Sequence, residues 1–196
     1  RVHKRLGKRP YWGYRPPPRP ANTVSWDRTA QIEIALDGVL ADGRIRVGIL
    51  GRMQREQISV RLASLNNWLR TERQPLGVTA ILDSLKDRSA ADIRPLIRRV
   101  ILDRDYDTDN RLAALELFSR GLDEKTEGEL LAVAKEIEDD SVAAAVFREL
   151  GKRPKLPSSE LLLARLSSIE EHVRAAALES LTKMEVKRVA PRVSAL

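Results

Sequence analysis

From Thr29 onward, apolar residues recur every three or four positions, which is the spacing of one helix face and differs from the alternation of a half-buried strand. Segments 91–102 and 128–137 show the pattern clearly, with apolar residues at i, i+3, i+4 and i+7. Helix-breaking residues interrupt it at Pro75, Gly121, 151–157 and Pro191. The pattern predicts an all-α chain with helices near residues 29–41, 44–55, 57–71, 76–87, 91–103, 110–120, 126–137, 141–151, 158–167 and 170–183. Polar residues at three of the predicted helix starts are expected N-caps: Asp92, Thr126 and Ser158.

These helical segments resemble one another at a period of 31 to 32 residues. Segment 173–181 matches 142–150 at an offset of 31, segment 174–181 matches 111–118 at an offset of 63, and we assign 60–68 as an earlier copy. A period of this length is typical of a solenoid, in which each helix pair buries its apolar face against the next pair. Small residues are expected where helices approach closely: Ala113, Ala114, Ala144, Ala145, Ala175 and Ala176. Large residues are expected between the layers: Leu115, Phe147, Leu150, Leu178 and Leu181.

A recurrent motif combines an acidic turn, Val-Arg, small residues and a Leu. It is clearest at 170–178, where the sequence reads Glu-Glu-His-Val-Arg-Ala-Ala-Ala-Leu. The other copies depart from it, with Ala143 in place of the Arg, Asn110 in place of the Val, and 57–59 in place of the acidic turn. Over residues 57–184 the chain resembles armadillo-like HEAT repeats, particularly the short type also found in phycobilisome-lyase-like proteins. The resemblance implies an α-solenoid of stacked antiparallel helix pairs, which in this family is mostly a binding scaffold.

The net charge of +7 lies entirely in the first 19 residues, which hold seven Lys and Arg and no Asp or Glu. The remaining 28 Lys and Arg balance all 28 Asp and Glu. The charge pattern therefore divides the chain into a basic arm, residues 1–28, and a neutral helical repeat domain, residues 29–196. Because charge placement bears on partners and not on fold, the arm indicates an anionic partner.

The basic arm also concentrates proline and aromatic residues. Five of the ten prolines lie there, and 15–20 reads Arg-Pro-Pro-Pro-Arg-Pro, which favours an extended chain close to polyproline II. Basic groups interleaved with Tyr and Trp suit a protein or nucleoprotein partner, a nucleic acid or an anionic membrane surface, and the spacing does not separate these uses. The residues expected to contact the partner are Arg1, Lys4, Arg5, Lys8, Arg9, Tyr11, Trp12, Tyr14, Arg15 and Arg19.

The composition excludes several chemistries. The absence of Cys removes disulfides, thiolate metal sites and thiol nucleophiles, and two distant histidines, His3 and His172, argue against a histidine metal centre. Phosphate-binding Gly-rich loops and a Gly-x-Ser-x-Gly elbow are also missing. His172 is expected to be an exposed turn residue. We therefore predict no catalytic residue, no metal and no cofactor.

The densest carboxylate cluster is 103–109. Asp105, Asp107, Asp109 and Glu116 fall at positions 1, 3, 5 and 12 of a calcium-binding EF-hand loop, although Asn110 replaces the usual turn Gly. The favoured interpretation is a repeat turn whose Asp residues cap the following helix, which explains the cluster without a metal.

Two further features of the sequence are compatible with contact to a nucleic acid. Trp68 with Asp83 or Asp87 mimics the groove of HEAT-like alkylpurine DNA glycosylases, but a neutral body argues against a DNA-holding groove and favours Trp68 as core. A basic run lies along one predicted helix side, at Arg94, Arg98, Arg99 and Arg104. It is expected to be a solvated face.

The function expected from these patterns is a non-catalytic HEAT-like scaffold or adaptor in a larger assembly, with the arm docked on an anionic partner. A nucleic-acid-binding repeat protein, ribosome- or DNA-associated, is one alternative. Another is the cytoplasmic repeat domain of a membrane-anchored protein with a polybasic juxtamembrane segment. A cytoplasmic location is favoured, while organellar, periplasmic and membrane-anchored locations stay open because the chain begins at Arg1 and not at Met. The oligomeric state stays open.

Overall fold

A computed structural model describes residues 29–56 and 58–184. Over these residues the chain forms ten helices and no strand, which confirms the all-α class. The helices are α2 (Ala30–Leu40), α3 (Gly43–Arg55), α4 (Leu62–Thr71), α5 (Pro75–Leu85), α6 (Ala90–Leu102), α7 (Thr108–Arg120), α8 (Gly128–Glu136), α9 (Ser141–Gly151), α10 (Ser159–Arg165) and α11 (Glu171–Lys183).

The helix boundaries lie within two residues of the predicted ones except at α4. That helix was expected from residue 57 and begins at Leu62, because Arg61 has extended backbone (φ −63°, ψ 134°) as its N-cap. Two predicted N-caps are wrong. Asp92 lies in the first turn of α6, which starts after Ser89, and Thr126 lies in a turn before Glu127, the N-cap of α8. Ser158 occupies the N-cap of α10, but its hydroxyl makes no capping hydrogen bond.

The chain divides into two units at residues 36 and 37, inside α2. The arm boundary predicted at residue 28 stays a prediction, because residues 1–28 lie outside the described part.

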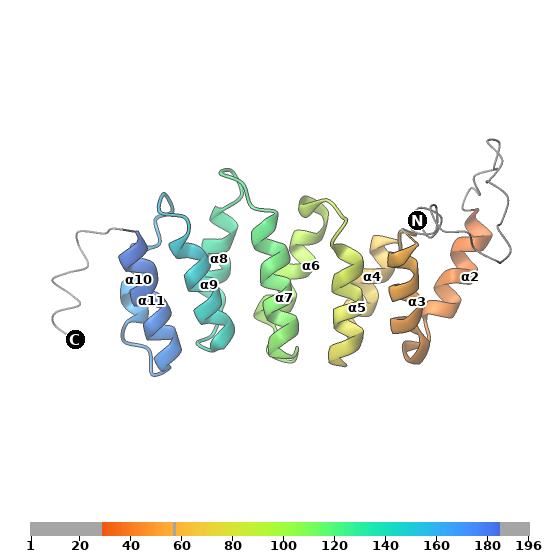
Figure 1. Ribbon diagram of the computed structural model, residues 1–196, viewed down its shortest axis with the longest axis horizontal. Coiled ribbons are helices and arrows are strands. Elements are labelled where there is room, and N and C mark those ends of the chain that lie inside the picture. Colours follow the sequence, from red (N-terminus) through yellow and green to blue (C-terminus); the bar gives the residue numbers. More distant parts are fainter. Residues whose placement is uncertain (1–28, 57, 185–196) are drawn as a thin grey trace, which may run out of the picture. The chain divides into compact units, whose positions relative to one another are not determined.

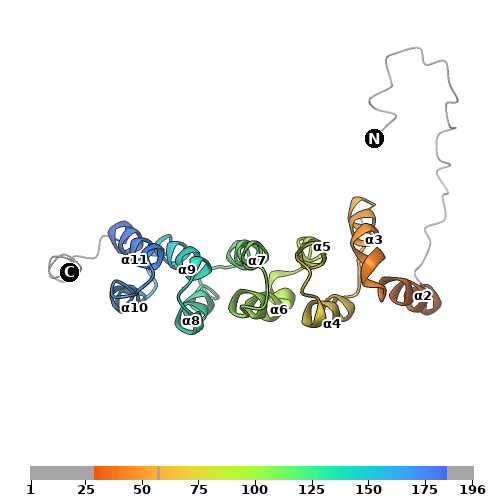
Figure 2. The same ribbon diagram turned by 90° about the horizontal axis from the view of Figure 1, so that it is seen from below.

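Within residues 37–184 the helices lie in two rows (Figures 1 and 2). One row holds α5, α7, α9 and α11, which contact one another in this order, and α3 contacts α5. The other row holds α4, α6, α8 and α10, and each of these helices contacts the partner that follows it in the chain. We use the word layer for each such pair: α4–α5, α6–α7, α8–α9 and α10–α11.

Three of the four sequence copies lie at equivalent places in these layers. Segments 111–118, 142–150 and 173–181 fall on α7, α9 and α11, the second helices of their pairs. The assignment of 60–68 as a further copy is wrong, because it lies on α4, a first helix. Both helices of a pair bury one face, so the short apolar pattern fits either of them.

The core lies between the two rows and between successive layers. Four of the large residues predicted between layers are buried: Leu115, Phe147, Leu150 and Leu181. Leu178 is the exception, with 41% of its surface exposed. The equivalent Phe147 is fully buried on α9, which has α7 on one side and α11 on the other. No helix follows α11 within the described residues, so Leu178 lacks this second neighbour.

Two glycines bring neighbouring helices close together, Gly151 between adjacent layers and Gly121 within the α6–α7 layer. A Cβ on Gly151, the last residue of α9, would lie 2.8 Å from the Cα of Ser180 on α11. The Ser180 hydroxyl also donates to the Phe147 carbonyl oxygen at 2.8 Å. A Cβ on Gly121 would likewise collide with Ala90. These contacts mean that α9 and α11 pack at a separation that only glycine allows.

Candidate interaction surface

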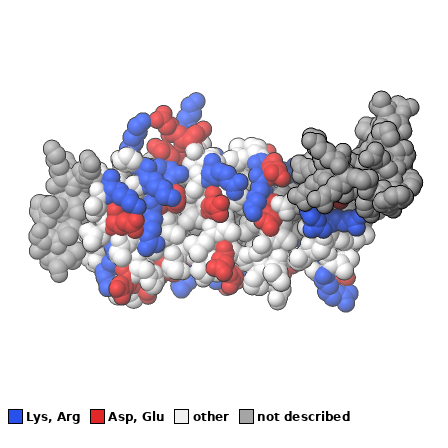
Figure 3. Space-filling model, viewed as in Figure 1, with Lys and Arg blue, Asp and Glu red and all other residues white. Residues whose placement is uncertain are grey.

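Nine of the 24 described Lys and Arg side chains are paired with a carboxylate of an adjacent layer or of a loop that joins layers. These pairs join residues 26 to 38 positions apart in the chain. They are Arg46–Glu72, Arg73–Asp103, Arg94–Glu129, Arg98–Glu136, Arg104–Glu138, Arg111–Asp140, Arg148–Glu179, Lys155–Glu124 and Arg165–Asp139. Blue and red side chains accordingly alternate over the visible face (Figure 3). Much of the charge of the body is therefore compensated by a nearby side chain of opposite sign.

This pairing refines the interpretation of the basic run at Arg94, Arg98, Arg99 and Arg104. Arg99 and Arg104 are exposed, as expected of a solvated face. Arg94, Arg98 and Arg104 each also contact a glutamate from the following layer. Arg94 is largely buried and also donates to the Gly121 carbonyl oxygen at 3.0 Å. The Glu138 carboxylate raises the pKa of the Arg104 guanidinium. The run therefore joins layers, and Arg99 alone among the four has no ion pair within the described residues.

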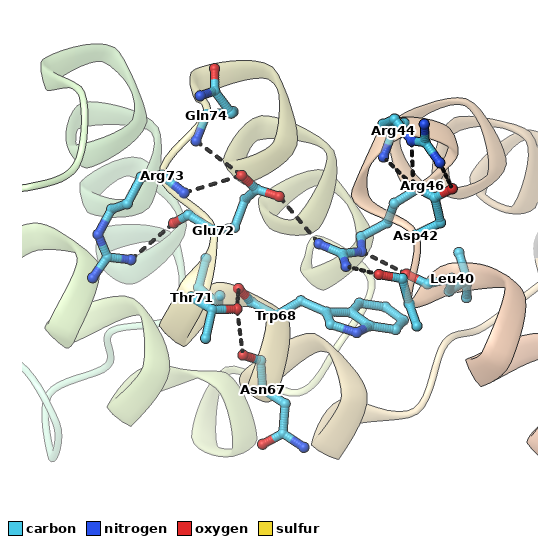
Figure 4. Close-up of polar contacts among 12 residues, drawn as sticks. Leu40, Asp42, Arg44, Arg46, Asn67, Trp68, Thr71, Glu72, Arg73 and Gln74 are labelled. Atoms are coloured by element: carbon cyan, nitrogen blue, oxygen red, sulfur yellow. Dashed lines mark hydrogen bonds and ion pairs between the residues drawn. The ribbon is translucent and has the colours of Figure 1, made fainter.

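A buried arginine on α3 joins the end of α2 to the end of α4 (Figure 4). The Arg46 side chain donates from Nε to the Leu40 carbonyl oxygen at 2.7 Å and from Nη1 to Glu72 Oε2 at 3.2 Å. Its guanidinium also lies 5.0 Å from the centroid of the Trp68 ring. Since only 8% of Arg46 is exposed, its charge is compensated by these acceptors and not by water.

Trp68 was predicted to be a core residue, but it is only half-buried and lies under the Arg46 guanidinium. It lies on α4, whereas Asp87 lines a hollow between α3 and α5 to which Trp68 does not contribute. The structure therefore gives no support to a Trp–Asp base-binding groove, and the stacked guanidinium accounts for the ring.

The arginine of the repeated motif has the same role in two later layers. Arg111 is buried and donates from Nε to the Ile101 carbonyl oxygen at 2.9 Å and from Nη1 to Asp140 Oδ2 at 2.6 Å. Asp140 is itself the N-cap of α9 and accepts from the Ala143 amide at 2.8 Å. Arg174 donates to the carbonyl oxygens of Ser168 and Ile169. The motif arginine thus closes the turn before α7 and before α11, whereas α9 carries Ala143 at this position.

The carboxylate cluster at 103–109 has the geometry of a helix start. Asp107 is the N-cap of α7 and accepts from the Asp109 amide at 2.9 Å, as the repeat-turn interpretation predicts. Asp103 accepts from the Asp105 amide and pairs with Arg73. Because α7 is helical from Thr108, the backbone from Asp109 to Glu116 cannot wrap around an ion. No group of His, Asp and Glu within the described residues could hold a metal.

The remaining histidine and tyrosine play separate parts. His172 is exposed in the first turn of α11, as expected, with Nε2 3.8 Å from Glu170 Oε2. Tyr106 is buried, which raises the pKa of its phenol, and its hydroxyl donates to the Leu69 carbonyl oxygen of the preceding layer. The Arg73 guanidinium lies 4.4 Å from the centroid of the same ring. Tyr106 is therefore a further link between layers.

Two hollows open on the side of α3, α5, α7 and α9, each between two neighbouring helices. The first, about 350 Å³, lies between α3 and α5 and is lined by Met53, Ile58 and Asp87 among others. The second, about 580 Å³, lies between the C-terminal halves of α7 and α9. Its apolar lining is Leu112, Leu115 and Ala145, and its polar lining is Glu116, Ser119, Arg120, Glu149, Lys152 and Arg153. We call this second hollow the α7–α9 hollow.

The ten arm residues predicted to contact a partner, Arg1 to Arg19, lie outside the described residues, so their contacts stay predictions. Among the described helices none is long and apolar enough to cross a bilayer.

The chain matches no family model, and neither a curated protein nor a solved structure is significantly similar to it. The resemblance to HEAT repeats consequently rests on the motif residues alone.

Proposed function

We propose that this protein is a non-catalytic, HEAT-like α-solenoid scaffold whose basic arm docks on an anionic partner, as a subunit of a larger assembly. The observation that carries the proposal is the distribution of charge. Fifteen of the 24 described Lys and Arg side chains are paired with a carboxylate, whereas residues 1–19 hold seven Lys and Arg and no Asp or Glu. An anionic partner is therefore attracted by the arm far more than by the body.

The helix contacts support the solenoid part of the proposal. The second helices α5, α7, α9 and α11 each contact the next one along the chain, and ion pairs and buried hydrogen bonds repeat between layers. Contacts restricted to neighbouring layers are typical of repeat arrays, which offer long surfaces for partner proteins.

Nucleic-acid binding is the second candidate, because the arm interleaves its cations with Tyr11, Trp12 and Tyr14. Aromatic side chains between cations stack on bases while the cations contact phosphates. The arm would then thread into RNA while the body contacts protein.

Charge-matched variants of the full chain test both candidates. In the arm variant, six residues become Gln: Arg1, Lys4, Arg5, Lys8, Arg9 and Arg15. In the control variant, six exposed residues without an ion pair among the described residues become Gln: Arg52, Arg55, Arg70, Arg99, Lys125 and Lys135. Both variants lose the same net charge. The probes are a 20-nucleotide RNA, polyglutamate and vesicles containing anionic lipid.

We expect the arm variant to lose most of its binding to at least one probe, while the control variant stays close to wild type. For RNA, the slope of log K against log salt should fall by about 0.7 for each lost phosphate contact. Equal losses in the two variants would show that the arm is not a separate device, and unchanged binding of the arm variant to all three probes would refute the proposal. The probe whose binding the arm variant loses identifies the kind of partner: polyglutamate stands for an acidic protein surface, RNA for a nucleic acid and the vesicles for a membrane.

A further inference from the structure

The α7–α9 hollow combines an apolar floor with a basic rim. We propose that it binds an acidic peptide segment of a partner protein, with one apolar side chain of the peptide in the hollow and carboxylates on either side. This inference goes beyond the scaffold proposal, because the hollow is formed by described residues and does not involve the arm.

The floor is suited to an apolar side chain. Leu115 is buried, and Leu112 and Ala145 are half-buried between the two helices. The volume of about 580 Å³ lies within the range of small binding pockets, about 300–1,000 Å³. The small Ala145 side chain keeps the hollow open, since a larger residue on α9 would fill it. An apolar side chain that enters contacts Leu112, Leu115 and Ala145 in place of water.

The rim is basic and partly fixed in position. Arg153 donates to the Glu149 carbonyl oxygen at 2.8 Å and, across the gap between α9 and α7, to the Ser119 carbonyl oxygen at 3.3 Å. Lys152 and Arg153 both contact the Glu149 carboxylate, so this acid faces two cations. Arg120 is exposed at the end of α7 and has no ion pair among the described residues. The cations thus outnumber the acids, Glu149 and Glu116.

An acidic peptide fits these observations better than a phosphate backbone does. A phosphate backbone would leave the apolar floor unused, and the body as a whole has no excess of cations to hold a polyanion. A peptide can instead place one carboxylate near Arg120 and another near Lys152 while an apolar side chain covers Leu112. Buried apolar contacts at the centre with charges at the rim are the usual anatomy of a protein interface.

The test measures fluorescence anisotropy of a labelled nine-residue peptide that has one Leu flanked by Glu and Asp. A second peptide replaces the Leu by Ser. All measurements use the full chain with the six arm residues changed to Gln, so that loss of binding at the hollow and loss of binding at the arm remain distinguishable.

Ala145→Trp fills the hollow and leaves every charge in place, and Ala132→Trp on α8, also half-buried, is its control. Arg120→Glu reverses the unpaired cation, and Arg99→Glu is its control, because Arg99 is likewise exposed in the last turn of a helix without an ion pair in the described part. Arg120→Glu also keeps the test decisive if either Trp variant fails to fold, which thermal melting reports.

We expect Ala145→Trp and Arg120→Glu each to weaken the Leu peptide about tenfold and the two controls to stay within about twofold. The Ser peptide should bind about tenfold more weakly than the Leu peptide, since it loses the apolar contact. Equal binding of both peptides, or equal effects of the variants and their controls, would overturn the proposal. Binding of an RNA oligonucleotide that Arg120→Glu abolishes and Ala145→Trp does not would also overturn it.

Discussion

The buried pair between Arg111 and Asp140 should make a measurable contribution to coupling between layers. Only 4% of the Arg111 side chain and 15% of the Asp140 side chain are exposed, and their oxygen–nitrogen distance is 2.6 Å. We consider Asp140→Asn, Arg111→Met and the double variant. Asn is as good an N-cap as Asp, so Asp140→Asn removes the charge and retains the cap of α9.

The expected costs follow from what each variant leaves unpaired. Asp140→Asn leaves a buried guanidinium without its counter-ion, which costs about 3 kcal/mol, the lower end of the usual range because Asp140 is partly accessible. Arg111→Met leaves the Ile101 carbonyl without this donor and costs about 2 kcal/mol. The double variant has no uncompensated charge and should cost about 2 to 3 kcal/mol in total. The coupling between the two residues is then about 2 to 3 kcal/mol.

Urea unfolding at pH 7 and 25 °C measures these free energies, provided that the m values of the four proteins agree. The control cycle uses Lys155 and Glu124, which also join neighbouring layers but are 78% and 81% exposed. Their coupling should be below about 1 kcal/mol. If the two single costs at Arg111 and Asp140 simply add, within about 0.5 kcal/mol, the pair does not couple the layers and the argument from burial fails.

Two further predictions concern the contact between α9 and α11. Gly151→Ala should destabilise the protein by about 1 to 3 kcal/mol in urea, because its Cβ meets the Ser180 backbone. Gly48→Ala, which meets nothing within 4 Å, should be neutral or slightly stabilising, and a neutral Gly151→Ala would mean that the helices can separate at little cost. Two cations lower the pKa of Glu179 below its ordinary value of 4.5: Lys183 has the larger effect, and Arg148 the smaller. The stabilisation by this carboxylate is therefore complete above pH 4.5 and is lost as the pH falls through the folded-state pKa. Wild type should consequently melt higher than Glu179→Gln at pH 7, and the difference should shrink as the pH is lowered below 4.5; a difference that is unchanged over the whole acid range would contradict the assignment.

The helices could be predicted from the sequence because their signal is local. Apolar periodicity and Pro or Gly punctuation located ten helices within a few residues, and the repeat-turn interpretation of Asp107 was confirmed as a cap. The start of α4 was misplaced because Ile58 and Val60 extend the apolar pattern without being helical. Periodicity reports which residues are apolar and not the backbone angle at Arg61.

The ion-pair partners and the α7–α9 hollow could not be predicted, because they depend on which helices lie next to one another. The sequence shows Arg94 as one of a basic run, but its partner Glu129 lies 35 residues away and is identified only by the stacking. Burial of Arg46 likewise depends on hydrogen bonds to the carbonyl oxygens of Leu40 and Ala41. Every residue has a backbone carbonyl, so the sequence does not indicate which ones accept. Leu178 was misassigned because burial at that position requires a neighbour beyond α11.

The spacing of the ion pairs between layers has a consequence for how this chain folds. Each pair closes a loop of only 26 to 38 residues, and the main helix contacts join elements that are close in the sequence. The contact order is therefore low, a property associated with fast folding. During synthesis, each layer can gain its counter-ions as soon as the following pair of helices leaves the ribosome. The described body can thus assemble stepwise from its N-terminal end, and each layer waits only for its immediate successor.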